Sequence, residues 1–133
     1  MNIAIMANDG KKDLMVQFCI AYCGILAGHS ICATKTTGQL ISDATGLPIS
    51  LCLSGSQGGT QQIGARIAYN EIDLVLFFCD PEDSVGQGRV NEITRLCDRH
   101  SIPVATNVAT GEMLIMGLKR GDLDWRDIVN PKK

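Results

Sequence analysis

The chain has 133 residues with a formal net charge of −2, and 45% of its residues are hydrophobic. This length suits one compact domain over residues 1–133, whose tail, 120–133, either frays or docks on a neighbour. The near-neutral net charge excludes non-specific electrostatic binding to nucleic acids or to a membrane surface. No apolar run reaches the roughly 18 residues of a membrane span. The N-terminus also lacks the pattern of a signal peptide, so we expect a cytoplasmic protein.

Short apolar runs alternate with amphipathic stretches along the whole chain. The apolar runs predict strands over 2–7, 30–34, 48–54, 73–79 and 102–106. The amphipathic stretches predict helices over 11–26, 37–45, 59–70, 90–100 and 109–119. Continuous apolar strands that alternate with helices are typical of a parallel sheet covered on both faces. We therefore predict an α/β fold: a single three-layer, Rossmann-like domain with a five-stranded parallel sheet.

A polar loop follows each predicted strand. In sequence order these loops read "ANDGKK", "TKTTG", "SGSQGGTQQ", "DPEDSVGQGR" and "TNVAT". Ligands of parallel α/β sheets bind beyond the carboxyl ends of the strands. We expect all five loops to converge there on one crevice.

Two of these loops have features of an anion site. In "ATKTTG", the hydroxyls of Thr34, Thr36 and Thr37 stand at the start of a helix, where free backbone N–H groups suit a phosphate. Gly38 lets the backbone come close to a ligand. Alternatively, a threonine of this loop only caps the helix, and the two roles are equally plausible from this loop alone. The second loop, "SGSQGG", is a glycine-rich turn before a helix and is typical of an anion-binding nest.

Charged residues near the predicted crevice complete the candidate set. Lys12 is placed to supply a positive charge to the same anion, while Lys35 either adds another or points into solvent. Asp9 and Asp80 follow predicted strands and are the candidate bases, with capping of the first helix as the alternative role of Asp9. Arg89 either contacts an added phosphate of the ligand or points into solvent, and we expect solvent.

The six cysteines form no CxxC pair, and each lies in an apolar run. Without a metal-ligand spacing, we expect buried, reduced thiols, no metal and no cofactor.

The stretches "ATKTTG", "SGSQGGTQQIGARI", "FFCDPED" and "IPVATNVAT" together resemble the methylglyoxal synthase family, in order and over nearly the whole chain. The resemblance implies a homohexamer that converts dihydroxyacetone phosphate to methylglyoxal and phosphate without metal or organic cofactor. It also implies that Lys12 and the threonine loop, with Gly55, hold the phosphate.

Six positions depart from the family pattern. Lys35 stands in place of a glycine, Ser56 in place of a proline and Val90 in place of an aspartate, and the other three departures concern the base and the histidines. Where the family motif reads Gly-Gly-Asp-Gln-Gln, with the aspartate as general base, this chain has Thr60. Asn8 and Gln87 stand where the family has histidines. A threonine hydroxyl does not accept a proton unaided, so these departures predict that catalysis is lost or altered.

We therefore predict a protein that binds a small phosphorylated metabolite or nucleotide as a sensor, sequestering protein or regulatory module. The alternatives are a methylglyoxal synthase or related phosphate-eliminating lyase that uses Asp80 or Asp9, and a structural partner in a family hexamer. The predicted ligand-binding residues are Asn8, Lys12, Thr34, Lys35, Thr36, Thr37, Gly38, Ser54, Gly55, Gly58, Gly59, Thr60 and Gln87.

Overall fold

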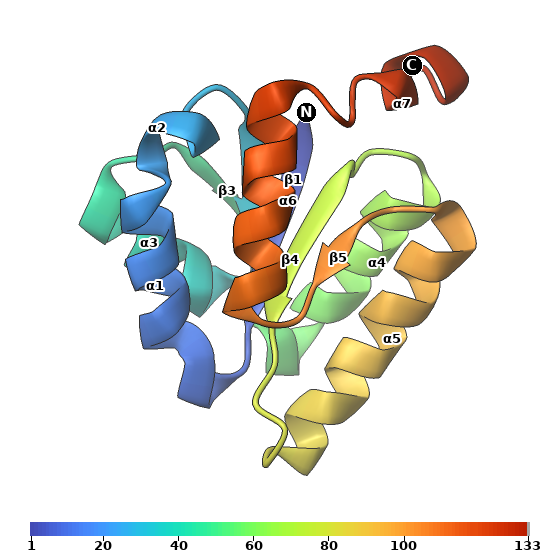
Figure 1. The fold of residues 1–133 in the computed structure, drawn as a ribbon. Coiled ribbons are helices and arrows are strands. Elements are labelled where there is room, and N and C mark those ends of the chain that lie inside the picture. Colours follow the sequence, from blue (N-terminus) through green and yellow to red (C-terminus); the bar gives the residue numbers. More distant parts are fainter. Residues whose placement is uncertain (133) are drawn as a thin grey trace.

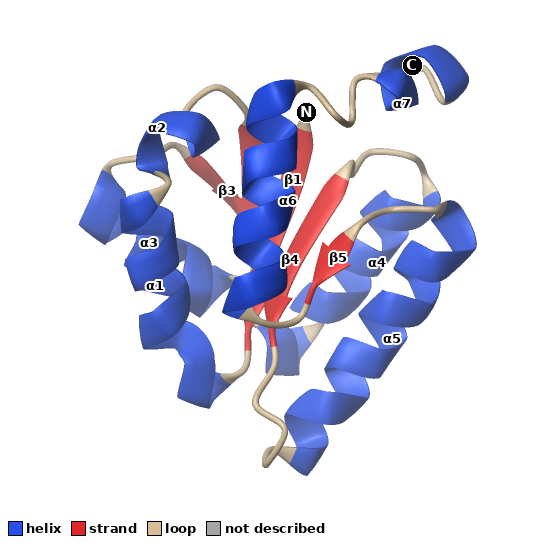
Figure 2. Cartoon of the chain, viewed as in Figure 1, coloured by secondary structure: helices blue, strands red, loops and turns tan. Residues whose placement is uncertain are grey.

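Five parallel strands form one sheet, in the order β3-β2-β1-β4-β5, in a computed structural model that describes residues 1–132 (Figures 1 and 2). The strands are β1 (Asn2–Ala7), β2 (Ser30–Ala33), β3 (Ile49–Leu51), β4 (Leu74–Phe78) and β5 (Val104–Ala105). All four pairings between neighbouring strands are parallel. The predicted five-stranded parallel sheet is thereby confirmed.

Helices follow the strands along the chain. They are α1 (Lys12–Ala21), α2 (Cys23–Leu26), α3 (Lys35–Thr45), α4 (Gly59–Ala68), α5 (Ser84–His100), α6 (Val108–Arg120) and α7 (Trp125–Val129), with 3₁₀ turns η1 (Asp9–Lys11) and η2 (Gly55–Gln57). Within residues 1–132, none of these helices is long and apolar enough to cross a membrane.

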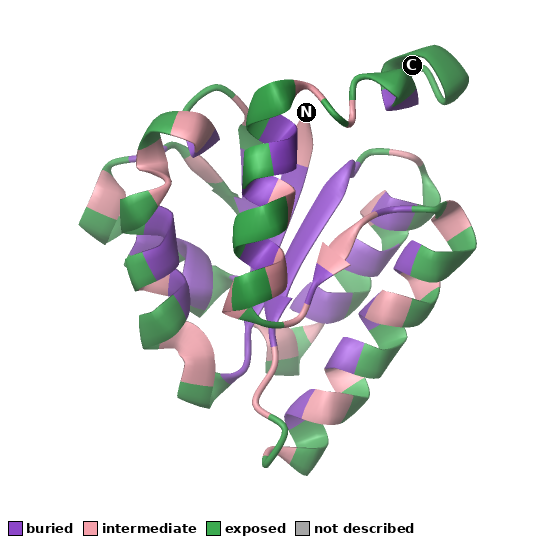
Figure 3. Cartoon of the chain, viewed as in Figure 1, coloured by how far each residue is buried: buried purple, intermediate pink, exposed green. Residues whose placement is uncertain are grey.

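The sheet is covered on both faces because side chains alternate along each strand. Ile3 and Ile5 of β1 pack with buried residues of α1, α3 and α6 on one face. Ala4 and Met6 pack with buried residues of α4 and α5 on the other face. Figure 3 shows β1 and β4 buried between these two layers of helices. The result is the predicted three-layer arrangement.

The strand order places a switch point at β1 and β4. Starting from β1, the chain proceeds through β2 to β3 on one side of the sheet, then returns to β4 and β5 on the other side. Such a reversal opens a crevice at the carboxyl ends of the central strands, and that crevice is where α/β proteins bind ligands.

Helix α5 and the C-terminal tail differ from the sequence prediction. Helix α5 begins at Ser84, not near residue 90, because the Asp83 side chain accepts a hydrogen bond from Gly86 N (2.9 Å) and caps the helix. The tail forms α7, which is anchored to its own chain: Arg126 is 1% exposed and contacts Asp73 and the Ser101 carbonyl.

Candidate functional site

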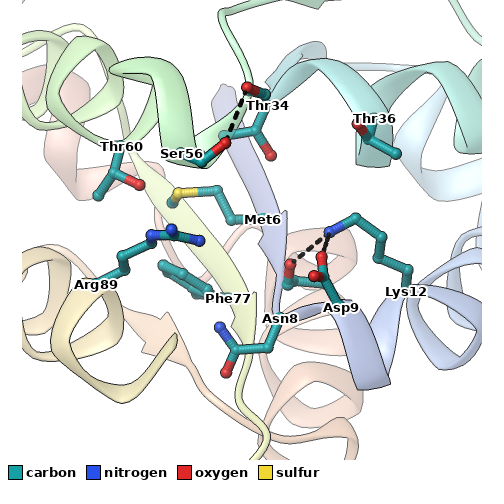
Figure 4. Close-up of a pocket in the computed structure, with 13 residues that line it drawn as sticks. Met6, Asn8, Asp9, Lys12, Thr34, Thr36, Ser56, Thr60, Phe77 and Arg89 are labelled. Atoms are coloured by element: carbon teal, nitrogen blue, oxygen red, sulfur yellow. Dashed lines mark hydrogen bonds and ion pairs between the residues drawn. The ribbon is translucent and has the colours of Figure 1, made fainter. Parts of the chain in front are cut away.

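A cavity of about 180 Å³ opens at the carboxyl edge of the sheet, where the switch point predicts it (Figure 4). It collects two residues at the end of β1, residues from the segments that follow β1, β2 and β3, and one residue each from β4 and α5. The lining residues are Met6, Ala7, Asn8, Asp9, Lys12, Thr34, Thr36, Ser54, Gly55, Ser56, Thr60, Phe77 and Arg89. The cavity is smaller than the sites of drug-sized ligands, which suits a small metabolite.

Lys12 provides one positive charge on the cavity wall. Its Nζ lies 2.7 Å from Asp9 Oδ1 and also donates to the carbonyl oxygen of Ala7 (3.3 Å). The Lys12 side chain is 20% exposed, whereas that of Asp9 is 96% exposed. The hydrogen bond and the charge of Lys12 hold the pKa of Asp9 below its usual value. Asp9 is therefore ionised at neutral pH, and its pairing with Lys12 leaves it a weak base.

The threonine loop presents hydroxyls to the cavity at the start of α3. Thr34 occupies the N-cap position, yet its side chain makes no capping hydrogen bond. The alternative of a simple threonine cap is therefore wrong for Thr34, which lines the cavity with Thr36. Thr37 is completely buried, and its Oγ1 has no hydrogen-bond partner within residues 1–132.

The second turn requires two adjacent glycines. Gly58 has a φ of 102°, in the left-handed region that favours glycine. A Cβ atom on Gly59 would lie 2.0 Å from the carbonyl oxygen of Leu53, so the start of α4 can approach that loop only without a side chain. These glycines shape the loop from which Ser54 and Gly55 reach the cavity.

Asn8 lines the cavity and also braces it. Its Oδ1 accepts a hydrogen bond from Asp80 N (2.8 Å), which ties the end of β1 to the segment after β4. A Cβ on Gly86 would lie 2.5 Å from Asn8 Nδ2, so the first turn of α5 packs directly on this amide. Asn8 is 4% exposed and holds its position through these contacts.

Arg89 is a cavity residue that the sequence analysis placed in solvent, and that expectation is wrong. Successive residues of a helix are about 100° apart, so residues two apart point in opposite directions. Arg89 faces the cavity. If Gly55 carried a Cβ atom, that atom would lie 3.6 Å from Arg89 Nη1 and 3.7 Å from Thr60 Oγ1. Gln87 turns away instead, accepting a hydrogen bond from the Cys79 thiol and donating one to Asn91 Oδ1 (3.0 Å each).

Several predicted site residues lie close to the cavity without lining it. Asp80 is turned toward its own loop, where its Oδ1 accepts a hydrogen bond from Glu82 N (3.0 Å). Lys35 is exposed on the first turn of α3. The predicted residues that do not line the cavity are Lys35, Thr37, Gly38, Gly58, Gly59, Asp80 and Gln87.

The described residues contain no metal-binding arrangement: nowhere in residues 1–132 do three or more His, Cys, Asp or Glu side chains gather for a metal ion. The six cysteines are unpaired, and three of them are buried. Burial raises the pKa of Cys19 and of Cys97 to about 12, so both are neutral thiols at physiological pH.

Comparisons with known proteins agree with this architecture. Residues 15–106 match the family described as the MGS-like domain. The chain is 58% identical to a methylglyoxal synthase from Caldicellulosiruptor saccharolyticus, over 99% of this chain and 94% of that protein. It is 49% identical to a methylglyoxal synthase from Oceanobacillus iheyensis, over 100% of this chain and 96% of that protein.

A solved structure is also similar. It is the crystal structure of methylglyoxal synthase from Elizabethkingia anophelis, which is 34% identical to this chain. The two superpose with a TM-score of 0.76, over 86% of this chain and 76% of the other.

Proposed function

Because the chain belongs to the MGS-like domain family, we propose that it acts as a methylglyoxal synthase-type lyase on dihydroxyacetone phosphate. The observation that carries the proposal is the small polar cavity at the switch point, where Lys12 and two threonines of the α3 loop share one wall. The relatives that match nearly the full length of the chain bear the name of this activity.

The phosphate group is assigned to the wall formed by Lys12, Thr34 and Thr36. A lysine ammonium, free hydroxyls and the first turn of an 11-residue helix are each suited to a phosphate. Ser54 and Gly55, from the turn after β3, also line the cavity.

The reaction requires a base. Removal of a proton from the hydroxymethyl carbon of dihydroxyacetone phosphate gives an enediolate, whose collapse breaks the carbon–oxygen bond to phosphate and leaves the enol of methylglyoxal. In residues 1–132, the carboxylate that lines the cavity belongs to Asp9. We assign the base to Asp9, whose Lys12-lowered pKa makes it weak and predicts slow turnover.

A second candidate function is binding of the phosphorylated metabolite without turnover. Thr60, at the position of the family's general base, is 1% exposed and lines the cavity beside Arg89. A neutral hydroxyl next to a permanent cation does not accept a proton, although both groups suit the binding of an anionic ligand. This pair of residues favours a binding protein that has kept the fold of the lyase.

One experiment separates the two functions. We would incubate the wild-type protein with dihydroxyacetone phosphate, follow free phosphate by ³¹P NMR, and measure methylglyoxal. The proposal expects both products from the wild type, and at least about tenfold less from Asp9→Asn, the loss typical of removing a general base. Lys12→Met should weaken binding, whereas Lys11→Met removes the same charge from a residue outside the cavity and should not.

The outcomes are distinct. Binding of dihydroxyacetone phosphate without either product would select the binding function, and absence of binding would reject both functions. Undiminished turnover by Asp9→Asn would leave the lyase proposal standing and remove Asp9 as its base.

A further inference from the structure

The cavity has two cations, contributed by different helices. Lys12 comes from α1 and Arg89 from α5, and Figure 4 shows them on opposite sides of the cavity, with Met6 and Phe77 drawn near Arg89. Dihydroxyacetone phosphate has one anionic group, which the proposed function assigns to Lys12. Arg89 therefore faces a part of the cavity that this substrate fills with neutral atoms.

The two cations differ in how far the protein neutralises them. Lys12 is paired with Asp9 at 2.7 Å. Within residues 1–132, no carboxylate lies within 4.0 Å of the Arg89 side chain. Its Nη1 lies 3.6 Å from the point that a Gly55 Cβ would occupy. Two cations thus oppose one carboxylate on the cavity wall, which leaves a net positive charge before any ligand enters.

Arginine binds oxyanions in a defined geometry. Its planar guanidinium presents a fork of N–H donors that matches a carboxylate or phosphate with two parallel hydrogen bonds. A half-buried guanidinium without a carboxylate partner therefore has unused donors that face the ligand. The cavity, at about 180 Å³, leaves more room for a planar carboxylate than for a second phosphate.

From these observations we propose that Arg89 forms a subsite for a carboxylate, so that the cavity prefers short phosphorylated carboxylic acids to uncharged triose phosphates. The phosphate end is held at Lys12, and in this respect the inference rests on the proposed function. Such an acid spans the cavity, with its carboxylate on Arg89 and its carbon chain along Met6 and Phe77. It is the ligand of a binding protein, or a competitive inhibitor of the lyase.

The test uses two unreactive probes that differ at one carbon. Glycerol 3-phosphate and 3-phosphoglycerate share three carbons and a phosphate, but the first ends in a hydroxymethyl group and the second in a carboxylate. We would titrate each into the wild type, Arg89→Gln, Arg89→Lys and Arg95→Gln by calorimetry at fixed ionic strength. Arg95→Gln removes the same charge from an exposed position on the same helix.

The expected result is a preference of about tenfold or more for 3-phosphoglycerate in the wild type and Arg95→Gln, the size of one charge-assisted interaction. Arg89→Gln should abolish the preference, because it weakens binding of 3-phosphoglycerate at least about tenfold more than binding of glycerol 3-phosphate. Arg89→Lys should keep part of the preference, because the positive charge remains but the paired N–H donors of the guanidinium are lost.

Equal affinity of the wild type for the two probes, or a preference that survives in Arg89→Gln, would overturn the carboxylate subsite alone. Tighter binding of propane-1,3-diol bisphosphate than of 3-phosphoglycerate would overturn the choice of a carboxylate. If neither probe nor inorganic phosphate binds, the phosphate site at Lys12 fails, and the proposed function fails together with the inference.

Discussion

Thr60 and Arg89 together decide what chemistry the cavity supports. The resemblance to the family implies an aspartate base at position 60, where this chain carries a buried threonine. Arg89 Nη1 and Thr60 Oγ1 both lie within 4 Å of the same point above Gly55. A carboxylate restored at position 60 would therefore face a cation, so this substitution tests more than one residue.

The first prediction concerns restoration of the base. In Thr60→Asp, the guanidinium of Arg89 lowers the pKa of the new carboxyl, which makes it a poor proton acceptor. In Thr60→Asp/Arg89→Gln, burial without a counter-charge raises that pKa toward neutrality. We expect the double variant to release methylglyoxal from dihydroxyacetone phosphate at least about tenfold faster than the single variant, in initial-rate assays at pH 7. Equal rates would show that Arg89 does not influence position 60.

At the scale of elements, the sequence predicts most of the sheet but misplaces one helix. The apolar runs locate all five strands, because a strand buried on both faces has an unmistakable composition. The stretch before Val90 contains two glycines and reads as a loop, yet Asp83 caps a helix that begins at Ser84. Because that helix directs Arg89 into the cavity and Gln87 out of it, a helix predicted to begin at residue 90 does not reveal Arg89 as the second cation of the cavity. The Asp83–Ser84 start signal is visible in the sequence, whereas the direction of Arg89 depends on tertiary packing.

The second prediction concerns the start of α4. Gly59→Ala places a methyl group 2.0 Å from the Leu53 carbonyl oxygen, so the helix must move away from the loop that carries Ser54 and Gly55. We expect the free energy of unfolding to fall by roughly 2–4 kcal/mol in urea titrations, the range of severe backbone and packing defects. Binding of glycerol 3-phosphate should weaken as well.

A matched glycine serves as the control for this change. Gly88 is also helical, and a Cβ there would have no neighbour within 4 Å. Gly88→Ala should raise the free energy of unfolding by roughly 0.5–1 kcal/mol, because alanine favours the helix. Similar losses in both variants would contradict the close approach of α4 to the Leu53 loop.

At the scale of the whole molecule, a buried ionic cluster ties the C-terminal segment to the sheet. Asp73, immediately before β4, accepts a hydrogen bond from Asn2 N (2.8 Å) and is paired with Arg126 of α7 (3.4 Å) and with Lys132. The side chains of Asp73 and Arg126 are each 1% exposed. Far from the cavity residues, this cluster joins both ends of the chain, so its loss should affect stability and not ligand binding.

The third prediction follows from the ionisation of Asp73. Burial opposes its charge, but the hydrogen bond from Asn2 N and the pairs with Lys132 and Arg126 outweigh that penalty and lower its pKa below 3.8. A carboxyl with a lowered folded-state pKa stabilises the protein at neutral pH, and this contribution is lost as the pH falls below about 4.

Asp73→Asn leaves the buried Arg126 without its counter-charge, so we expect the free energy of unfolding to fall by roughly 3–5 kcal/mol at pH 7. That loss should shrink as the pH falls below about 4, because the unfolded chain then binds a proton that the ionised Asp73 of the folded protein does not. Urea titrations from pH 3 to 7, with the exposed Asp98→Asn as the matched charge change, measure both effects. A destabilisation by Asp73→Asn that stays constant across this range would show that packing, and not the charge of Asp73, anchors α7.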